Sequence, residues 1–197
     1  MYRYAGTLFF AFSAVALGSA GDISKVNGSI DVAAGQQAGD VSTVNGSITV
    51  GSGGQVRDVE TVNGSVRLES RATARAVETV NGAVVLAEEA VVSEGVSAVN
   101  GKLTLRRGAR VAGRLENVNG AFVLEGATVG GGIETVSGDV LVGAGSRVEN
   151  GILVEKNRGW SWNKSDRPRV TIESGAMVNG TLRFEREVDL YVGAGAV

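Results

Sequence analysis

The sequence predicts an all-β fold: a single-domain parallel β-helix, or solenoid, built from about nine coils of 18–19 residues. Two observations predict this fold. A short motif returns at a nearly constant spacing, and apolar residues alternate with polar ones beside each copy of it. The composition agrees, because 30 glycines and one proline suit a chain of short strands joined by many turns. The handedness of the coil stays open, with a right-handed path preferred.

The repeated motif is Val-Asn-Gly, and neighbouring copies lie 18 or 19 residues apart. A period of that length is too short for repeats that contain helices, and it suits one coil of three short strands. Val-Ser-Gly at residues 136–138 continues the series, and Val-Asn-Gly returns at residues 178–180. The regular copies begin at Val26, Val44, Val62, Val80, Val99 and Val118.

Each repeat also carries a fixed pattern of apolar residues. An aliphatic residue stands three positions before the valine of the motif, and two more follow the glycine with the alternation of a half-buried strand. Because neighbouring strands lie about 4.8 Å apart, stacked coils would bury these residues in columns and form a rod of roughly 40 Å. The first column contains Ile23, Val41, Val59, Val77, Val96, Leu115 and Ile133.

The asparagines of the motif occupy one corner of successive coils. Their side-chain amides are suited to hydrogen bonding from coil to coil, and the adjacent glycine can supply the positive φ of a turn. The alternative interpretation is that Asn-Gly is only a favoured turn pair. The ladder is preferred, and either interpretation is structural. The predicted ladder contains Asn27, Asn45, Asn63, Asn81, Asn100 and Asn119.

Residues 155–169 break the period and predict a loop inserted into the β-helix domain, which spans residues 21–197. Indole rings can stack on sugars, and cationic side chains can pair with phosphates or carboxylates. The loop is therefore a candidate ligand site for a cell-envelope glycan, and the alternative is a flap that only packs on the rod. Its candidate ligand-binding residues are Trp160, Trp162, Arg158, Lys164 and Arg167.

Residues 1–20 have the pattern of a secretory signal peptide. Arg3 precedes an apolar run over residues 5–17, and Gly18 and Ala20 provide small residues for cleavage before Gly21. An uncleaved membrane anchor is the alternative. The signal predicts an exported protein that is periplasmic, on the cell surface or secreted. No later stretch is apolar and long enough to suggest a transmembrane segment.

The composition argues against most enzyme classes. The chain has no cysteine, which removes thiol catalysis and thiolate metal sites, and no histidine, which removes the commonest general base and transition-metal ligand. We therefore expect a non-enzymatic protein with no cofactor and no metal. The formal net charge of −2 predicts no nucleic-acid partner.

The stacked Val-Asn-Gly-Ser-Ile coils resemble the bacterial β-strand-repeat proteins described as adhesins. The glycine-rich segments at residues 126–133 and 175–182 are similar to bactofilins, which are polymer-forming bacterial β-helix proteins. The resemblance covers most of residues 22–197. It implies an adhesin-like or bactofilin-like solenoid and gives no catalytic residue. Bactofilins are generally cytoplasmic, so the signal peptide is a departure from that family.

A six-residue spacing also needs an explanation. From Val26 to Val92 every sixth residue is Val, Leu or Ala, and the spacing then becomes seven at Val99. Such spacing is similar to that of hexapeptide left-handed β-helices, many of which are acyltransferases with a catalytic histidine. Because this chain has no histidine, an acyltransferase is rejected.

Acidic residues recur at equivalent positions of neighbouring coils, where stacking would bring carboxylates near 5 Å apart. Such a strip could bind calcium or act as an acid/base pair in a carbohydrate-active enzyme. The preferred interpretation is a solvated outer face whose charges oppose aggregation. The residues are Asp22, Asp40 and Asp58, with the vertical pairs Glu60 with Glu78 and Glu116 with Glu134.

No amphipathic helix or charged cap is evident at either end of the expected rod. Exposed strand edges could stack end to end, and a head-to-tail contact would give a homo-oligomer or a filament. The alternatives are that Phe184, Tyr191 or loop residues cover the last coil, or that the chain is truncated. The sequence thus predicts an exported structural or adhesin-like rod that could self-assemble end to end. A glycan-binding module that uses the Trp160/Trp162 loop is the alternative function.

Overall fold

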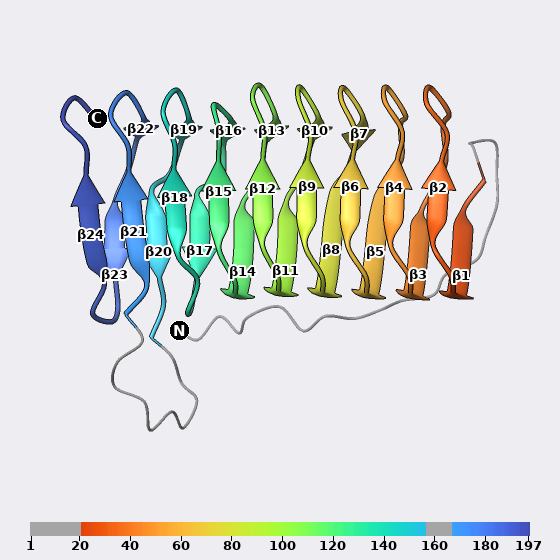
Figure 1. The fold of residues 1–197 in the computed structure, drawn as a ribbon, viewed down its shortest axis with the longest axis horizontal. Helices are drawn as coiled ribbons and strands as arrows, with labels where there is room; N and C mark the ends of the chain where they lie inside the picture. The colour runs from red at the N-terminus through yellow and green to blue at the C-terminus, as the bar shows by residue number, and fades with distance from the viewer. Residues whose placement is uncertain (1–20, 157–166) are drawn as a thin grey trace.

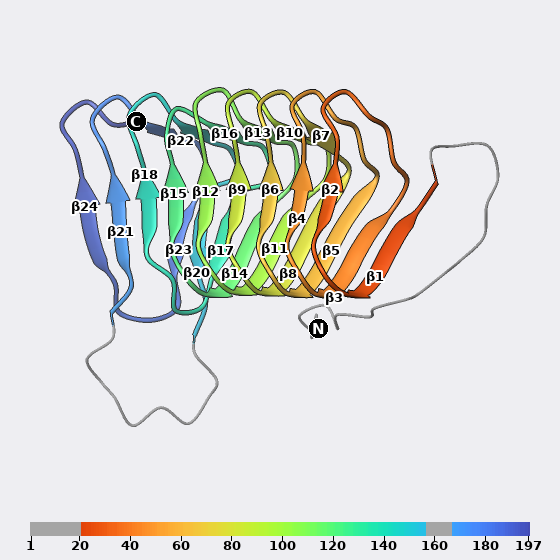
Figure 2. The same ribbon diagram turned by 45° about the vertical axis from the view of Figure 1, so that its right-hand side comes forward.

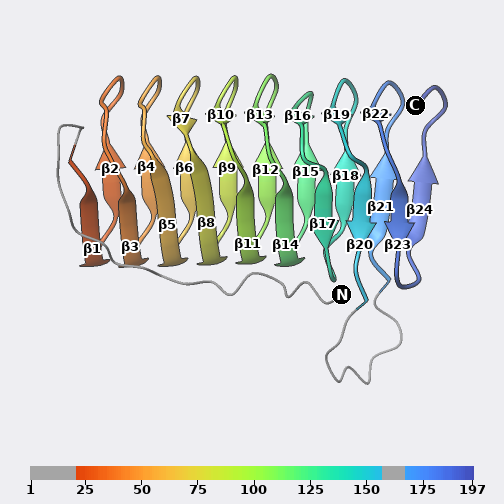
Figure 3. The same cartoon turned by 180° about the vertical axis from the view of Figure 1, so that it is seen from behind.

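The computed structural model describes residues 21–156 and 167–197, and in these ranges the chain forms a parallel β-solenoid without helices (Figure 1). Successive coils follow one another along the rod from the N-terminal end to the C-terminal end, as the turned views in Figures 2 and 3 also show. The predicted fold class is therefore confirmed. The predicted signal peptide, residues 1–20, lies outside the described residues.

Three parallel sheets form the sides of the rod. In the described residues, sheets A and B each contain nine strands and sheet C contains six. Every coil adds one strand to sheet A and then one to sheet B, and most coils add a short strand to sheet C. Isolated bridges from Gln37 to Gln55 and from Gln55 to Thr73 continue sheet C toward the N-terminal end.

The strand bounds reflect the repeat. Sheet A consists of β1 (Ile23–Asn27), β3 (Val41–Asn45), β5 (Asp58–Asn63), β8 (Ala76–Asn81), β11 (Val96–Asn100), β14 (Leu115–Asn119), β17 (Ile133–Thr135), β20 (Ile152–Val154) and β23 (Leu182–Phe184). Sheet B consists of β2 (Ile30–Val32), β4 (Ile48–Val50), β6 (Val66–Leu68), β9 (Val84–Leu86), β12 (Leu103–Leu105), β15 (Phe122–Leu124), β18 (Val140–Val142), β21 (Arg169–Ile172) and β24 (Asp189–Val192). Sheet C consists of β7 (Thr73–Ala74), β10 (Val91–Val92), β13 (Arg110–Val111), β16 (Thr128–Val129), β19 (Arg147–Val148) and β22 (Met177–Val178).

The strands pair in register, so each position of the repeat forms a column along the rod. Val41 pairs with Val59, and Val59 pairs with Val77. The inward columns of aliphatic side chains form one continuous core, in which Phe122 is the largest fully buried side chain. Each buried aliphatic contributes about 1.5–3 kcal/mol relative to an exposed one, so the columns supply the main stabilising term.

The valine of each of the six regular Val-Asn-Gly copies faces outward, whereas Val178 of the last copy pairs with Val148 in sheet C and packs against the core. Val26 is 65% exposed, and the equivalent Val44, Val62 and Val80 are partly exposed rather than core residues. The six-residue spacing therefore combines inward residues such as Val32 and Val50 with outward valines. Strand alternation explains this result, because the motif valine stands an odd number of positions after the buried aliphatic of the same strand.

The residue just before the motif valine points inward, and in most coils it is polar. The sequence analysis did not predict this buried polar column. Thr61 is fully buried, and its hydroxyl donates to the main-chain oxygen of Gly46 in the preceding coil at 3.0 Å. Thr43 and Thr79 make the equivalent bonds. Asn117 replaces threonine in a later coil and donates to Gly101 at 2.6 Å. Hydrogen bonding makes the buried threonine hydroxyls and the Nδ2 of Asn117 tolerable, whereas the buried Oδ1 of Asn117 has no partner among the described residues.

The role expected for the motif glycines needs a correction. Positive φ angles occur at Gly28, Gly101 and Gly120, but not at Gly46, Gly64 or Gly82. At all of these positions beyond the first coil, a Cβ would overlap the main-chain oxygen of the glycine in the preceding coil. Glycine is therefore required here mainly because the corners stack closely.

The inserted segment lies between sheets A and B. Strand β20 ends at Val154, and β21 resumes at Arg169 and pairs with β18. The insertion thus takes the place of the Asn-Gly corner in its coil. In the described residues, no helix is long and apolar enough to cross a membrane.

Candidate functional site

The asparagine corner forms a continuous series of side-chain hydrogen bonds. Each Nδ2 donates to the Oδ1 of the asparagine one coil earlier, from Asn45 bonding to Asn27 through to Asn119 bonding to Asn100. The five distances are 3.0, 3.0, 3.1, 2.9 and 3.2 Å. The series ends at Asn119, because Ser137 occupies the next position.

Two arginines bind the first aspartates of the acidic strip. Arg57 donates to both carboxylate oxygens of Asp40, at 2.6 and 2.7 Å, and to Asp22 at 3.2 Å. The hydrogen bond from Arg57 is the main reason that the pKa of Asp40 is lowered. Arg75 makes the equivalent contact with Asp58. These aspartates are therefore neutralised, which leaves them poorly suited to holding a cation.

Glu60 and Glu78 are the acidic pair that the structure leaves without a cationic partner. They pair directly in the register of β5 and β8, and within the described residues neither forms an ion pair. Burial is the largest cause that raises the pKa of Glu60, followed by the charge of Glu78. The pKa of Glu78 is also raised, mainly by burial and then by Asp58. Both carboxyls thus hold their protons more tightly than exposed glutamates.

The second predicted pair is bound differently. Glu116 and Glu134 pair in register, and Arg114 donates to them at 3.3 and 2.9 Å. The pKa of Glu134 is still raised, first by burial and then by Glu116, while Arg114 opposes this rise. In the described part of the chain, no three potential metal-binding side chains come together.

A notch in the corner between sheets B and C is a feature that the sequence reading missed. Leu124 and Val129 are five residues apart, whereas the equivalent residues of other coils, such as Leu105 and Val111, are six apart. The corner above β15 is visibly lower than its neighbours (Figure 1). The uneven spacing was the available signal in the sequence.

A serine compensates for the shortened corner. The buried hydroxyl of Ser146, which is 1% exposed, accepts hydrogen bonds from the main-chain N–H groups of Gly126 at 2.9 Å and Ala127 at 3.3 Å. Most other coils have alanine at this position, for example Ala90 and Ala109, and close the corner with a main-chain turn bond. The corner that lacks one residue does not form the usual turn bond. The serine hydroxyl instead accepts from the two N–H groups at that corner.

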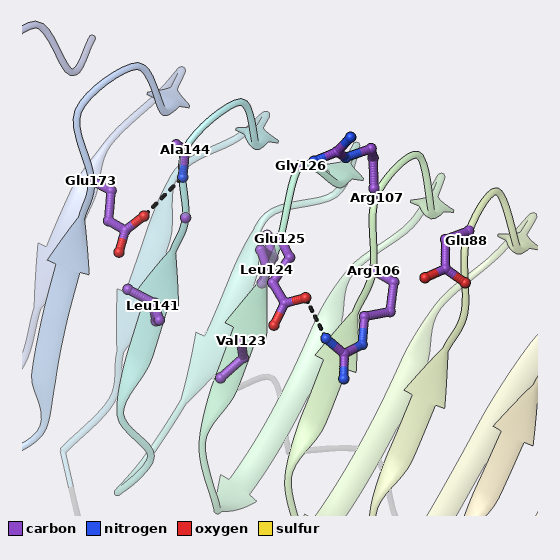
Figure 4. Close-up of a pocket in the computed structure, with 11 residues that line it drawn as sticks. Glu88, Arg106, Arg107, Val123, Leu124, Glu125, Gly126, Leu141, Ala144 and Glu173 are labelled. Carbon is purple, nitrogen blue, oxygen red and sulfur yellow. Dashed lines mark hydrogen bonds and ion pairs between the residues drawn. The ribbon is translucent and has the colours of Figure 1, made fainter.

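The notch forms an open cavity of about 620 Å³ with a mixed lining (Figure 4). Val123 and Leu141 contribute apolar surface, and Arg106 pairs with Glu125 at 2.6 Å. Glu173 accepts a hydrogen bond from the main-chain N–H of Ala144 at 3.0 Å. Among the described residues, the guanidinium of Arg107 has no polar partner. The notch can therefore offer one cation to an acidic group beside an apolar floor.

The last coil exposes residues that are buried elsewhere. Leu190 is 42% and Val192 is 58% exposed, although both stand in columns whose preceding members, Val170 and Ile172, are 0% and 4% exposed. Leu182 and Phe184 are only partly buried. A shallow cavity of about 680 Å³ lies beside this edge and includes Tyr191. Neither Phe184 nor Tyr191 covers the coil completely.

The opposite end carries charge. Lys25 occupies the inward column that contains Thr43 and Thr61 in the following coils. Its ammonium group is exposed and donates to the main-chain oxygen of Ser29 at 2.7 Å. The N-terminal edge therefore exposes a charged side chain at a position that is buried in the inner coils.

Most of the predicted ligand loop lies outside the part of the chain that the structure describes. Trp160, Trp162, Arg158 and Lys164 lie outside the described residues. Arg167 is described, and its exposed guanidinium pairs with the exposed Glu187 at 2.8 Å. Exposed pairs of this kind contribute little to stability.

The comparisons give no relative from which a function could be transferred. A scan against protein-family models finds no match, and searches of curated proteins and of solved structures find none either.

Proposed function

We propose that this chain is an exported, non-enzymatic structural or adhesin-like rod that associates end to end through its C-terminal coil. The observation that carries this proposal is the exposure of Leu190 and Val192 in columns that are otherwise closed. An exposed strand edge with apolar side chains is a template for pairing with another chain. A second copy is the proposed occupant.

The two ends differ in a way that favours contact between two C-terminal edges. In a head-to-tail stack, Lys25 of one copy would lie on Phe184 of the next, since both occupy the same inward column. Burying an ammonium group there without a paired charge is costly. Contact between two C-terminal edges avoids this cost and joins two rods into a longer one.

The test is sedimentation velocity over a range of protein concentrations. The wild-type protein should shift to a dimer as concentration rises. The double variant Leu190→Glu/Val192→Glu should stay monomeric, because its carboxylates would be buried at the contact. Val26→Glu is the control, because Val26 is exposed on the outer face at the other end and its change should leave the dimer intact. A wild-type protein that stays monomeric at every concentration overturns the proposal.

The notch favours a second function, recognition of an acidic envelope glycan. Its support is the guanidinium of Arg107, which has no polar partner among the described residues and lies beside an apolar floor. Titration with a uronic-acid oligosaccharide should show binding that Arg107→Ala abolishes. The matched control is Arg110→Ala, which removes another exposed arginine outside the notch. Equal affinity for both variants rules out the notch as the site.

A further inference from the structure

Asn119 and Gly120 stand at the open end of the asparagine ladder. From Asn27 to Asn100, every Oδ1 accepts a hydrogen bond from the next asparagine. The main-chain N–H of each following glycine, from Gly28 to Gly101, donates to the main-chain oxygen of the asparagine one coil later at 2.8–3.1 Å. Both groups are thus held in place at the inner positions.

Neither restraint is present at Asn119. Ser137 replaces asparagine in the next coil, and the guanidinium of Arg186 donates to its hydroxyl at 3.2 Å and to the main-chain oxygen of Val136 at 3.0 Å. Within the described residues, the Oδ1 of Asn119 accepts no hydrogen bond and the N–H of Gly120 donates none. The side-chain amide keeps its hydrogen bond to Asn100, but with the two other bonds missing it and the neighbouring main-chain nitrogen are less restrained than at the inner positions.

We propose that Asn119 is the ladder position that deamidates first. The nitrogen of Gly120 attacks Cγ of Asn119, a new C–N bond forms, and the bond from Cγ to Nδ2 breaks. Nδ2 leaves as ammonia and takes up the proton that the Gly120 nitrogen loses. Solvent water then opens the cyclic imide at either carbonyl carbon, which gives aspartate or isoaspartate. Glycine favours the attack because it has no Cβ to hinder it.

The modification would weaken the end of the ladder. The Nδ2 of Asn119 donates to Oδ1 of Asn100 at 3.2 Å, and a carboxylate cannot replace that donor. The carboxylate oxygens of the product would face the Oδ1 of Asn100, and neither side could donate a hydrogen bond. The coils would therefore begin to separate at β14, and the N–H of Gly101 in the coil before it would lose its hydrogen bond to Asn119.

The chain contains a matched internal comparison. Asn81 and Asn119 both lie in the tetrapeptide Val-Asn-Gly-Ala, so their intrinsic reactivities should be alike. Asn81 is inside the ladder, where its Oδ1 accepts from Asn100 and Gly82 donates to Asn100. In the folded protein they differ in their position in the ladder and in the φ angle of the following glycine, which is positive at Gly120 but not at Gly82.

The experiment is peptide mapping by mass spectrometry during incubation of the purified protein at mildly alkaline pH. In the folded protein, Asn119 should convert about tenfold faster than Asn81 or more, because two hydrogen bonds restrain Asn81. In guanidinium chloride the two rates should be equal. Equal rates in the folded protein overturn the proposal.

A variant tests the cause separately. Ser137→Asn places an amide beyond Asn119 and extends the ladder by one coil. The rate at Asn119 should then fall toward that of Asn81. An unchanged rate at Asn119, in a variant whose thermal unfolding matches the wild type, would show that the ladder does not protect its members.

Discussion

The glycine that follows each ladder asparagine is required by the packing of one coil on the next. Gly64 has an ordinary φ angle, but a Cβ at that position would overlap the main-chain oxygen of Gly46. The same overlap recurs at Gly82 and Gly101. The short distance between coils therefore requires glycine at this position. Because the corners stack regularly, the neighbouring asparagines form a column in which their side-chain amides hydrogen-bond to one another.

Gly64→Ala should destabilise the fold, because neither the new methyl group nor the opposing main chain can move away easily. Overpacking of this kind costs about 1–3 kcal/mol. The measurement is chemical denaturation, with Ser65→Ala, at the exposed neighbouring position, as the control. Equal midpoints for the two variants would contradict the close stacking at this corner.

The pair Glu60 and Glu78 predicts a stability that depends on pH. Their pKa values are raised in the folded state, so their stabilising contribution is present below the unfolded pKa and is lost as pH rises through the folded pKa. Glu60→Gln should therefore raise the unfolding temperature at neutral pH, by an amount that corresponds to about 0.5 kcal/mol.

The same substitution should have little effect below about pH 4, where the unfolded carboxyl is also protonated. Thermal unfolding at both pH values measures the difference. Glu88→Gln, on an exposed corner, is the control. A destabilised Glu60→Gln variant at neutral pH would mean that the glutamate has a favourable partner.

At the scale of the element, the coil is a unit whose length can vary at a corner if the polar groups are still satisfied. The coil that contains β15 and β16 lacks one corner residue, and Ser146 of the next coil supplies the missing acceptor. The side effect is the notch. A coil that is one residue shorter at a corner can thus form a local cavity when a neighbouring side chain supplies the missing acceptor.

Ser146→Ala should destabilise the protein by about 1–3 kcal/mol, because the buried N–H of Ala127 and the partly buried N–H of Gly126 lose their acceptor. The control is the same substitution in a variant with one glycine inserted between Glu125 and Gly126, which restores the usual corner length. There the loss should be small, as alanine occupies this position in other coils. Equal losses in both backgrounds, measured by chemical denaturation, would contradict this explanation.

The sequence predicted the strands and coils better than it predicted the direction and the partners of individual side chains. The period and the aliphatic columns follow from burial, which constrains every coil alike, and they identified the solenoid. The outward direction of the motif valines and the inward direction of Thr61 were not predicted, although strand alternation from the buried aliphatic of the same strand, such as Val59, specifies both. Partners such as Arg57 and Asp40 depend on side-chain paths, which the repeat does not specify.

At the scale of the whole molecule, the rod has two unlike ends. The N-terminal edge places Lys25 in an inward column, whereas the C-terminal edge exposes Leu190 and Val192. An inward charge on an edge strand opposes pairing with another chain. The proposed assembly is therefore a closed pair of rods rather than a filament that continues to grow.

Lys25→Thr should convert the N-terminal edge into one that can stack, because it continues the column of Thr43 and Thr61. We expect species larger than the dimer to form with rising concentration, and light scattering after size-exclusion chromatography measures them. Lys102→Thr, which removes an exposed lysine from an inner coil, is the control. If Lys25→Thr stops at the same size as the wild type, Lys25 does not limit the assembly.

The most direct test of end-to-end association is small-angle X-ray scattering of the purified protein at low and high concentration. One rod of nine stacked strands is about 40 Å long, and two rods joined at their C-terminal coils would be about 80 Å long. The proposal predicts that the length doubles while the cross-section stays constant. A constant length at all concentrations, or a cross-section that grows instead, would contradict it.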